Sequence, residues 1–260
     1  MLILLSPAKA LDFEPRGVEM ETTRPVLMDR TRILSKTTAN LTAPKLKQLM
    51  GLSDDLAVLN RERFKAFDPD NGEGRPAAMV FNGEVYRGLD AKSMTETDLS
   101  WAQDRLRILS GLYGVLRPLD AIQPYRLEMG TRLKTRKGAN LYDFWGEDIA
   151  RALKADLAAQ SRPAVVNLAS NEYSKAAKLK TLGVPVITPD FKEEKDGRLR
   201  ALMVYAKQAR GSMARWIIDN RIEDPEALKD FAVGGYRFEP DGSSADKWLF
   251  TRPQPAPVKA

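Results

Sequence analysis

The sequence predicts a mixed α/β fold of the α+β kind, in which helices surround a central mixed sheet. Short apolar runs that end at Gly, Pro or Asn recur along the chain, which is typical of buried strands. Segments with apolar residues at helical spacing lie between these runs. Because the two types mix without strict alternation and 43% of the 260 residues are hydrophobic, we expect a single domain over residues 1–251 with a sizeable core.

The first strand is predicted at Leu2–Leu5, where Ser6 and Pro7 end an apolar run. The same pattern predicts further strands at Ala77–Phe81, Ala164–Leu168, Val184–Thr188, Leu199–Tyr205, Phe231–Phe238 and Trp248–Thr251.

A helix is predicted at Tyr142–Ala159, because Trp145, Ile149 and Leu153 recur every four residues. Other helices are predicted at Pro25–Thr38, Ala43–Met50, Asp54–Phe64, Thr95–Gln103, Asn171–Leu182 and Tyr205–Asp219. The proline-rich tail Arg252–Ala260 is expected to be disordered.

The composition excludes several kinds of chemistry, because the chain contains no cysteine and no histidine. Disulfides, thiol nucleophiles, imidazole bases and soft metal sites are impossible, so we predict no metal site and no cofactor. Only an oxygen-ligand site for an ion such as Mg²⁺ stays chemically open. The N-terminus lacks a basic leader and no apolar run is long enough to span a membrane. We therefore expect a cytoplasmic protein with no membrane partner.

The segment Arg105–Gly130 mixes glycines, prolines and arginines with apolar residues. Between Arg105 and Lys137 there are eight Lys and Arg residues and only two acidic residues. The net charge of this segment therefore equals the net charge of +6 of the whole chain. Such clustering attracts anionic ligands. We interpret the segment as the wall of a basic cleft, with charged groups presented to a ligand and with Gly111 and Gly114 allowing a close approach to the backbone.

The pattern Leu49–Ala57 is that of a helix-hairpin-helix, inserted at about residues 43–64. In that motif a glycine turn leaves backbone N–H groups of the second helix free to bind a phosphate of duplex DNA. Ser53 stands where a second glycine is usual. The candidate DNA-binding residues are Lys45, Lys47, Gly51, Ser53, Arg61 and Arg63. An ordinary pair of helices packed on the core is the alternative interpretation.

Polar clusters next to predicted strands suggest a second kind of function, that of an enzyme or receptor for a small anionic or nucleotide-like ligand in the cleft. The candidates are Lys9, Tyr113, Arg126, Glu128, Asn171 and Lys247. Arg126 is suited to hold an anionic group, and Glu128 or Lys9 to act as an acid or base if burial shifts their pKa values. Helix capping and solvated surface are the alternatives. No phosphate-binding loop, dinucleotide fingerprint or nucleophile elbow is present, so the catalytic residues stay unassigned.

Taken together, these segments resemble the YaaA family of peroxide stress proteins. The resemblance covers nearly the whole chain except the tail. It rests on Leu5–Lys9, Phe81–Leu89, Leu109–Asp120, Pro124–Met129, Asn167–Tyr173 and Lys247–Phe250, which occur in one order.

The resemblance implies a cytoplasmic protein that limits oxidative damage when peroxide rises and that is tied to lower free iron. It also implies a mixed α/β fold with a basic cleft and a helix-hairpin-helix that binds double-stranded DNA. It brings no settled catalytic mechanism. Because the chain lacks His and Cys, we expect any effect on iron to be indirect, or to use a carboxylate site that the sequence does not reveal.

Overall fold

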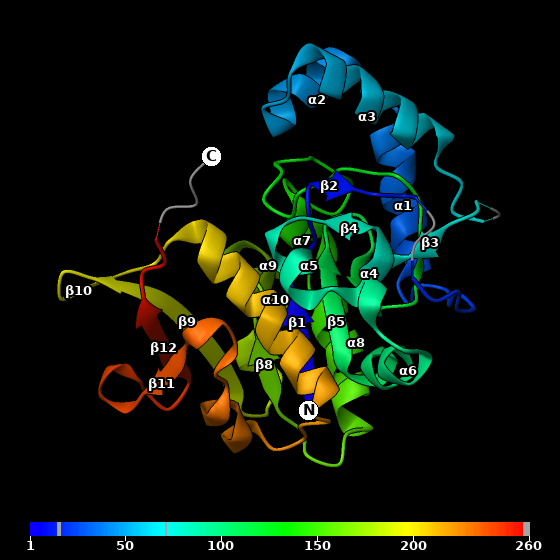
Figure 1. Cartoon of the computed structure of the whole chain (residues 1–260). Helices are drawn as coiled ribbons and strands as arrows, with labels where there is room; N and C mark the ends of the chain where they lie inside the picture. Colours follow the sequence, from blue (N-terminus) through cyan, green and yellow to red (C-terminus); the bar gives the residue numbers. More distant parts are fainter. Residues whose placement is uncertain (15–16, 71, 257–260) are drawn as a thin grey trace.

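An eight-stranded mixed sheet forms the centre of the fold, which confirms the predicted α/β class (Figure 1). The computed structural model describes residues 1–14, 17–70 and 72–256. Seven strands follow the order β11-β12-β9-β8-β1-β5-β6, and β10 pairs with β9. The pairs from β12 to β5 are parallel, whereas β11, β6 and β10 are antiparallel to their neighbours.

The strands of this sheet are β1 (Leu2–Leu5), β5 (Leu106–Ser110), β6 (Gly114–Leu116), β8 (Val165–Asn167), β9 (Val186–Lys195), β10 (Arg198–Arg200), β11 (Arg237–Glu239) and β12 (Lys247–Pro253). Two small ribbons pair β2 (Ala10–Leu11) with β4 (Phe81–Asn82), and β3 (Arg75–Pro76) with β7 (Ala121–Ile122). All four residues of β1 are completely buried, as expected for a central strand of a covered sheet.

The α-helices are α1 (Met28–Ala39), α2 (Ala43–Met50), α3 (Asp54–Ala66), α4 (Ala77–Val80), α5 (Glu84–Leu89), α6 (Glu96–Arg105), α7 (Leu141–Trp145), α8 (Asp148–Ala158), α9 (Asn171–Ala176) and α10 (Met203–Asp219). Short 3-10 helices are η1 (Ala91–Ser93), η2 (Leu179–Thr181), η3 (Pro225–Asp230), η4 (Val233–Gly235) and η5 (Pro240–Gly242). In Figure 1, α10 crosses in front of the central strands, and α2 and α3 lie at the opposite end of the molecule from the N-terminus.

Three strand predictions need correction. Ala77–Phe81 is mainly the short helix α4, because a short, fully buried apolar run has no periodicity that separates helix from strand. Leu199–Tyr205 divides between the end of β10 and the start of α10. Phe231–Phe238 contains the 3-10 helix η4, in which Gly234 adopts a φ of 70°, and only its last two residues, Arg237 and Phe238, lie in a strand, β11.

Two predicted helices are each broken by a residue in the left-handed region. Tyr142–Ala159 divides into α7 and α8 at Gly146, where φ is 52°. Asn171–Leu182 divides into α9, which ends at Ala176, and the 3-10 helix η2, which begins after Lys178, where φ is 47°. The expected disordered tail is also wrong at its start, because Arg252 and Pro253 pair with β9 as part of β12. Residues 257–260 lie outside the described residues.

The segment Arg105–Gly130 supplies β5 and β6 at the edge of the sheet, and its glycines serve internal packing. A Cβ on Gly111 would lie 2.2 Å from the carbonyl oxygen of Leu127. Gly114 has a φ of 73°, and a Cβ there would lie 2.8 Å from the ring of Trp145. The interpretation that these glycines admit a ligand is therefore corrected, since protein atoms already fill the space.

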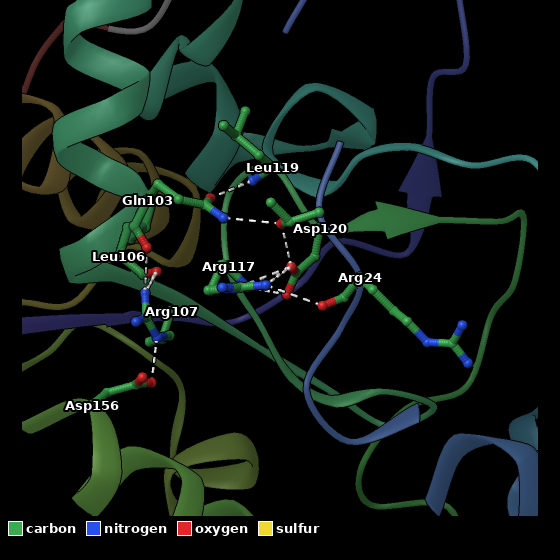
Figure 2. Close-up of polar contacts among 9 residues, drawn as sticks. Arg24, Gln103, Leu106, Arg107, Arg117, Leu119, Asp120 and Asp156 are labelled. Carbon is green, nitrogen blue, oxygen red and sulfur yellow. Dashed lines mark hydrogen bonds and ion pairs between the residues drawn. The ribbon is translucent and has the colours of Figure 1, made fainter. Parts of the chain in front are cut away.

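The first arginines of the same segment pair with acidic side chains, as Figure 2 shows for Arg107 and Arg117. Arg107 is 5% exposed in its side chain and pairs with Asp156 at 2.6 Å, and Arg105 pairs with Glu223. The guanidinium of Arg117 contacts Asp120 at 3.0 Å. These charges are neutralised locally, which corrects the expectation that the segment presents them to a ligand.

Asp120 is the centre of a polar network, and its side chain has no exposure to solvent. Its oxygens accept hydrogen bonds from the backbone N–H of Arg117 at 2.8 Å and from the hydroxyl of Thr23 at 2.6 Å. Gln103 donates to Thr23 and accepts from the backbone N–H of Leu119 (Figure 2). The network fixes the turn after β6, from which the chain continues towards Tyr125.

Replacing Asp120 by Asn should lower the free energy of unfolding by about 3 kcal/mol, because Arg117 loses a counter-ion inside the protein. Urea unfolding followed by circular dichroism measures the change. Asp29→Asn is the matched control, because Asp29 pairs with Arg32 but is 96% exposed. This surface pair should contribute too little to move the unfolding midpoint. Equal midpoints for the two variants would contradict the role given to Asp120.

Candidate functional site

A cleft of about 540 Å³ opens where β1 and β8 end. Ligands favour this edge of a parallel sheet because neighbouring strands deliver loops and helix starts to it. The lining comes from the segment after β1, the start of α5, residues 125–128, the start of α9 and one face of α10. Sequence segments far apart in the chain thus share one wall.

Hydrogen bonds fix the two loops that follow the strands. The hydroxyl oxygen of Ser6 accepts a bond of 2.8 Å from the backbone N–H of Ser170, and its hydroxyl lies 3.3 Å from that of Ser170. The Tyr86 hydroxyl donates to the carbonyl oxygen of Ser6 at 3.0 Å. The floor of the cleft is therefore held by contacts among β1, β8 and α5.

Three of the predicted cleft residues meet at one side of this cleft. Lys9 lies 3.0 Å from one carboxylate oxygen of Glu128, and Arg126 lies 3.1 Å from the other. Arg126 is only 16% exposed in its side chain, so this ion pair is largely sheltered from solvent. Glu128 compensates both cations, and the group as a whole carries one positive charge.

Two further cations, Lys207 and Arg210, line the cleft from α10 and were missed by the sequence analysis. Met203, Lys207 and Arg210 follow one another at spacings of four and three residues, which places them on one helix face. Burial lowers the pKa of Arg210, while the nearby carboxylate of Asp190 acts in the opposite direction. The sequence shows by its helical spacing that these residues share a face of α10. It does not show that this face meets the cleft.

The position of α10 depends on two glycines at its crossing with α5. A Cβ on Gly211 would lie 1.7 Å from the carbonyl oxygen of Val85, and a Cβ on Gly88 would lie 2.1 Å from the carbonyl oxygen of Gln208. The two backbones are therefore in direct contact. This contact sets the distance between α5 and the cations of α10.

The other three candidate residues lie outside the lining. Tyr113 is buried, and its hydroxyl oxygen accepts a 3.0 Å bond from the backbone N–H of Gln123. Asn171 is exposed at the start of α9, beside the lining residues Ser170 and Glu172. Lys247 lies in β12 and pairs with Asp190 at 3.0 Å.

The α2–α3 pair (residues 43–66) contains the predicted DNA-binding residues. Gly51 ends α2 with a φ of 61°, and Ser53 begins α3 by accepting a bond from the backbone N–H of Leu56. A Cβ on Gly51 would meet nothing within 4 Å, so this side of the turn is open. Lys47 pairs with Asp54 in the first turn of α3 at 2.8 Å.

The remaining basic residues of the α2–α3 pair differ in their accessibility. Lys45 is exposed and contacts Gln48, whereas Arg61 is partly covered and pairs with Glu62 at 3.0 Å. Burial lowers the pKa of Arg63. The first turn of α3 also carries Asp54 and Asp55, which oppose an anion at this helix start.

The buried tyrosines predict how the protein responds to alkali. Burial raises the pKa values of Tyr86, Tyr113, Tyr125 and Tyr173 well above the ordinary value near 10. Above about pH 10 the unfolded chain therefore loses protons that the folded chain retains, so stability should fall as the pH rises.

Absorbance at 295 nm during alkaline titration, recorded with circular dichroism, should show these four tyrosines ionising only as the fold is lost. Urea unfolding at pH 9 and pH 11 provides the stability comparison. Reversible ionisation of all seven tyrosines of the chain near pH 10 with the fold retained would contradict the burial described here.

No helix among the described residues is both long and apolar enough to cross a membrane. In the same part of the chain, no group of three or more His, Cys, Asp or Glu side chains is arranged to hold a metal ion.

Comparison with known proteins assigns the family. The family described as peroxide stress protein YaaA matches residues 1–242. A UPF0246 protein of Maricaulis maris (strain MCS10) is 61% identical over 256 residues, covering 98% of this chain and 97% of the relative. A UPF0246 protein of Caulobacter vibrioides (strain NA1000 / CB15N) is 58% identical over 255 residues, covering 98% and 100%. The resemblance stated from the sequence motifs is confirmed, and the chain belongs to the YaaA family of peroxide stress proteins.

Proposed function

We propose that this chain acts in the peroxide stress response by binding double-stranded DNA through the α2–α3 pair, largely without sequence preference. The open left-handed turn at Gly51 is the observation that carries the proposal. It stands directly before α3, where no described residue accepts a hydrogen bond from the backbone N–H of Asp54 or Asp55. Free N–H groups at a helix start suit a phosphate oxygen.

The charge around the turn supports a phosphate contact of modest strength. Five basic side chains of the α2–α3 pair outnumber three acidic ones, the basic residues being Lys45, Lys47, Arg61, Arg63 and Lys65. Asp54 and Asp55 oppose the phosphate, and Lys47 compensates one of them. Affinity then comes mainly from the phosphate backbone, which is common to all sequences and weakened by salt.

Replacing Lys45 and Lys47 together by Glu should weaken binding to duplexes of any sequence, because two phosphate-attracting charges are reversed. Gly51→Val should act in the same direction by forcing a β-branched residue into the left-handed region. Fluorescence anisotropy with two duplexes of unrelated sequence measures both. Wild-type affinity should fall roughly 10³- to 10⁵-fold between about 50 and 200 mM salt if six to ten phosphates are contacted.

Two controls sharpen this experiment. Lys154→Glu changes an exposed lysine of α8 and should leave the affinity close to that of the wild type. Asp54→Asn should raise the affinity, because it removes a like charge and frees Lys47. If the Lys45/Lys47 variant binds as the wild type does and binding is insensitive to salt, the α2–α3 pair does not carry the interaction.

We also propose that the chain limits iron-driven damage by acting at DNA and not by storing iron. The chain has no His or Cys, the side chains that bind transition metals most readily. Anaerobic calorimetric titration with Fe²⁺ should therefore detect no tight stoichiometric binding. Tight binding of one or more Fe²⁺ per chain would overturn this part of the proposal.

A further inference from the structure

The α10 wall of the cleft presents two cations that form no ion pair with any described residue. Among the described residues, none forms a hydrogen bond or ion pair with Lys207 or Arg210, although both line the cleft. Asp190 is the nearby carboxylate that acts on Arg210, yet its ion pairs are with Lys247 at 3.0 Å and Lys192 at 3.6 Å. Keeping a half-buried guanidinium unpaired has a cost that a bound anion would remove.

The acidic residues of the cleft, in contrast, all have partners. Glu128 is held between Lys9 and Arg126, and Glu84 pairs with Arg87 at 2.5 Å. A carboxylate oxygen of Glu172 accepts a bond of 2.7 Å from the backbone N–H of Gly130. The two uncompensated charges are therefore concentrated at α10.

The remainder of the lining suits the uncharged body of a ligand. Tyr125, Leu168 and Tyr173 are buried residues that border the cavity, and Met203 stands exposed at its edge. Ser6 and Ser170 add hydroxyl groups at the strand ends. A volume of about 540 Å³ lies within the range of roughly 300 to 1,000 Å³ that is usual for small-molecule sites.

We propose that this cleft binds a small phosphomonoester with a flat, partly apolar body, of the size of a mononucleotide. The phosphate lies against Lys207 and Arg210, and the body lies along the tyrosine and leucine side of the cavity. Two uncompensated positive charges match a phosphomonoester, which carries nearly two negative charges at neutral pH, better than a carboxylate. The site is separate from the α2–α3 pair, so the inference does not rest on the proposed DNA binding.

Calorimetric titration of the full chain with AMP, GMP, CMP and UMP tests the proposal. At least one mononucleotide should bind, and its affinity should exceed that of its nucleoside and of inorganic phosphate by tenfold or more. Lys207→Gln and Arg210→Lys should each weaken binding about tenfold, which is about 1.4 kcal/mol, because each variant loses a charge-assisted hydrogen bond to the phosphate. Arg210→Lys keeps the charge and loses only the planar fork, which limits the risk to folding.

Lys154→Gln is the control and should bind the nucleotide as the wild type does, because this residue does not line the cleft. Three results would overturn the proposal. The first is that none of the four mononucleotides binds at about 1 mM, a concentration that corresponds to a binding free energy near −4 kcal/mol. The second is that inorganic phosphate binds as tightly as the best mononucleotide. The third is that excess duplex DNA displaces the mononucleotide. The last result would make the cleft part of a DNA surface, whereas failure of the duplex experiments alone leaves this inference intact.

Discussion

The hydrogen bonds and ion pair of the buried Asp120 carboxylate are the interactions on which the wall of the cleft at residues 125–128 depends. The carboxylate receives the backbone N–H of Arg117, the guanidinium of the same residue and the hydroxyl of Thr23. The chain before α1 is thereby tied to the turn that follows β6. Tyr125–Glu128 lines the cleft and follows this turn after a few residues. The network therefore positions these lining residues through the chain and without direct contact.

Beyond residue 242, where the family match ends, the chain still contributes to the sheet and to the charge of the cleft. β12 lies between β9 and β11 and brings Lys247 to Asp190. Lys247 thus acts on the cleft indirectly, because it pairs with the same carboxylate that acts on Arg210. Arg252, at the other end of this strand, stacks between the rings of Tyr205 and Tyr236, 4.9 and 4.4 Å from their centroids.

Sequence reasoning recovered the elements whose signals are local. The predicted bounds are close to the observed ones for β1, α2, α3, α6 and α10. Apolar runs and helix caps depend only on residues that are neighbours in the sequence. Lys9, Arg126 and Glu128 lie together in the structure, a convergence that the sequence could not show because it depends on how two distant segments fold. Lys207 and Arg210 were missed because their role depends on which face of α10 meets the cleft. Arg107 and Arg117 were misinterpreted because the partners Asp156 and Asp120 are buried beside them only in the folded chain, a tertiary effect that charge counting does not detect.

The contact of Gly88 and Gly211 has a consequence for how the cleft can change. Where side chains separate two helices, changes of rotamer allow the helices to slide past each other. A pocket between them can then widen to accept a larger ligand. Here carbonyl oxygens occupy the place of side chains, so α10 has no adjustable layer beneath it. The backbone contact therefore sets the distance between the cations of α10 and the ends of the strands. For the proposed ligand, this backbone contact would limit the size that fits, and a larger residue at either glycine would displace both cations together.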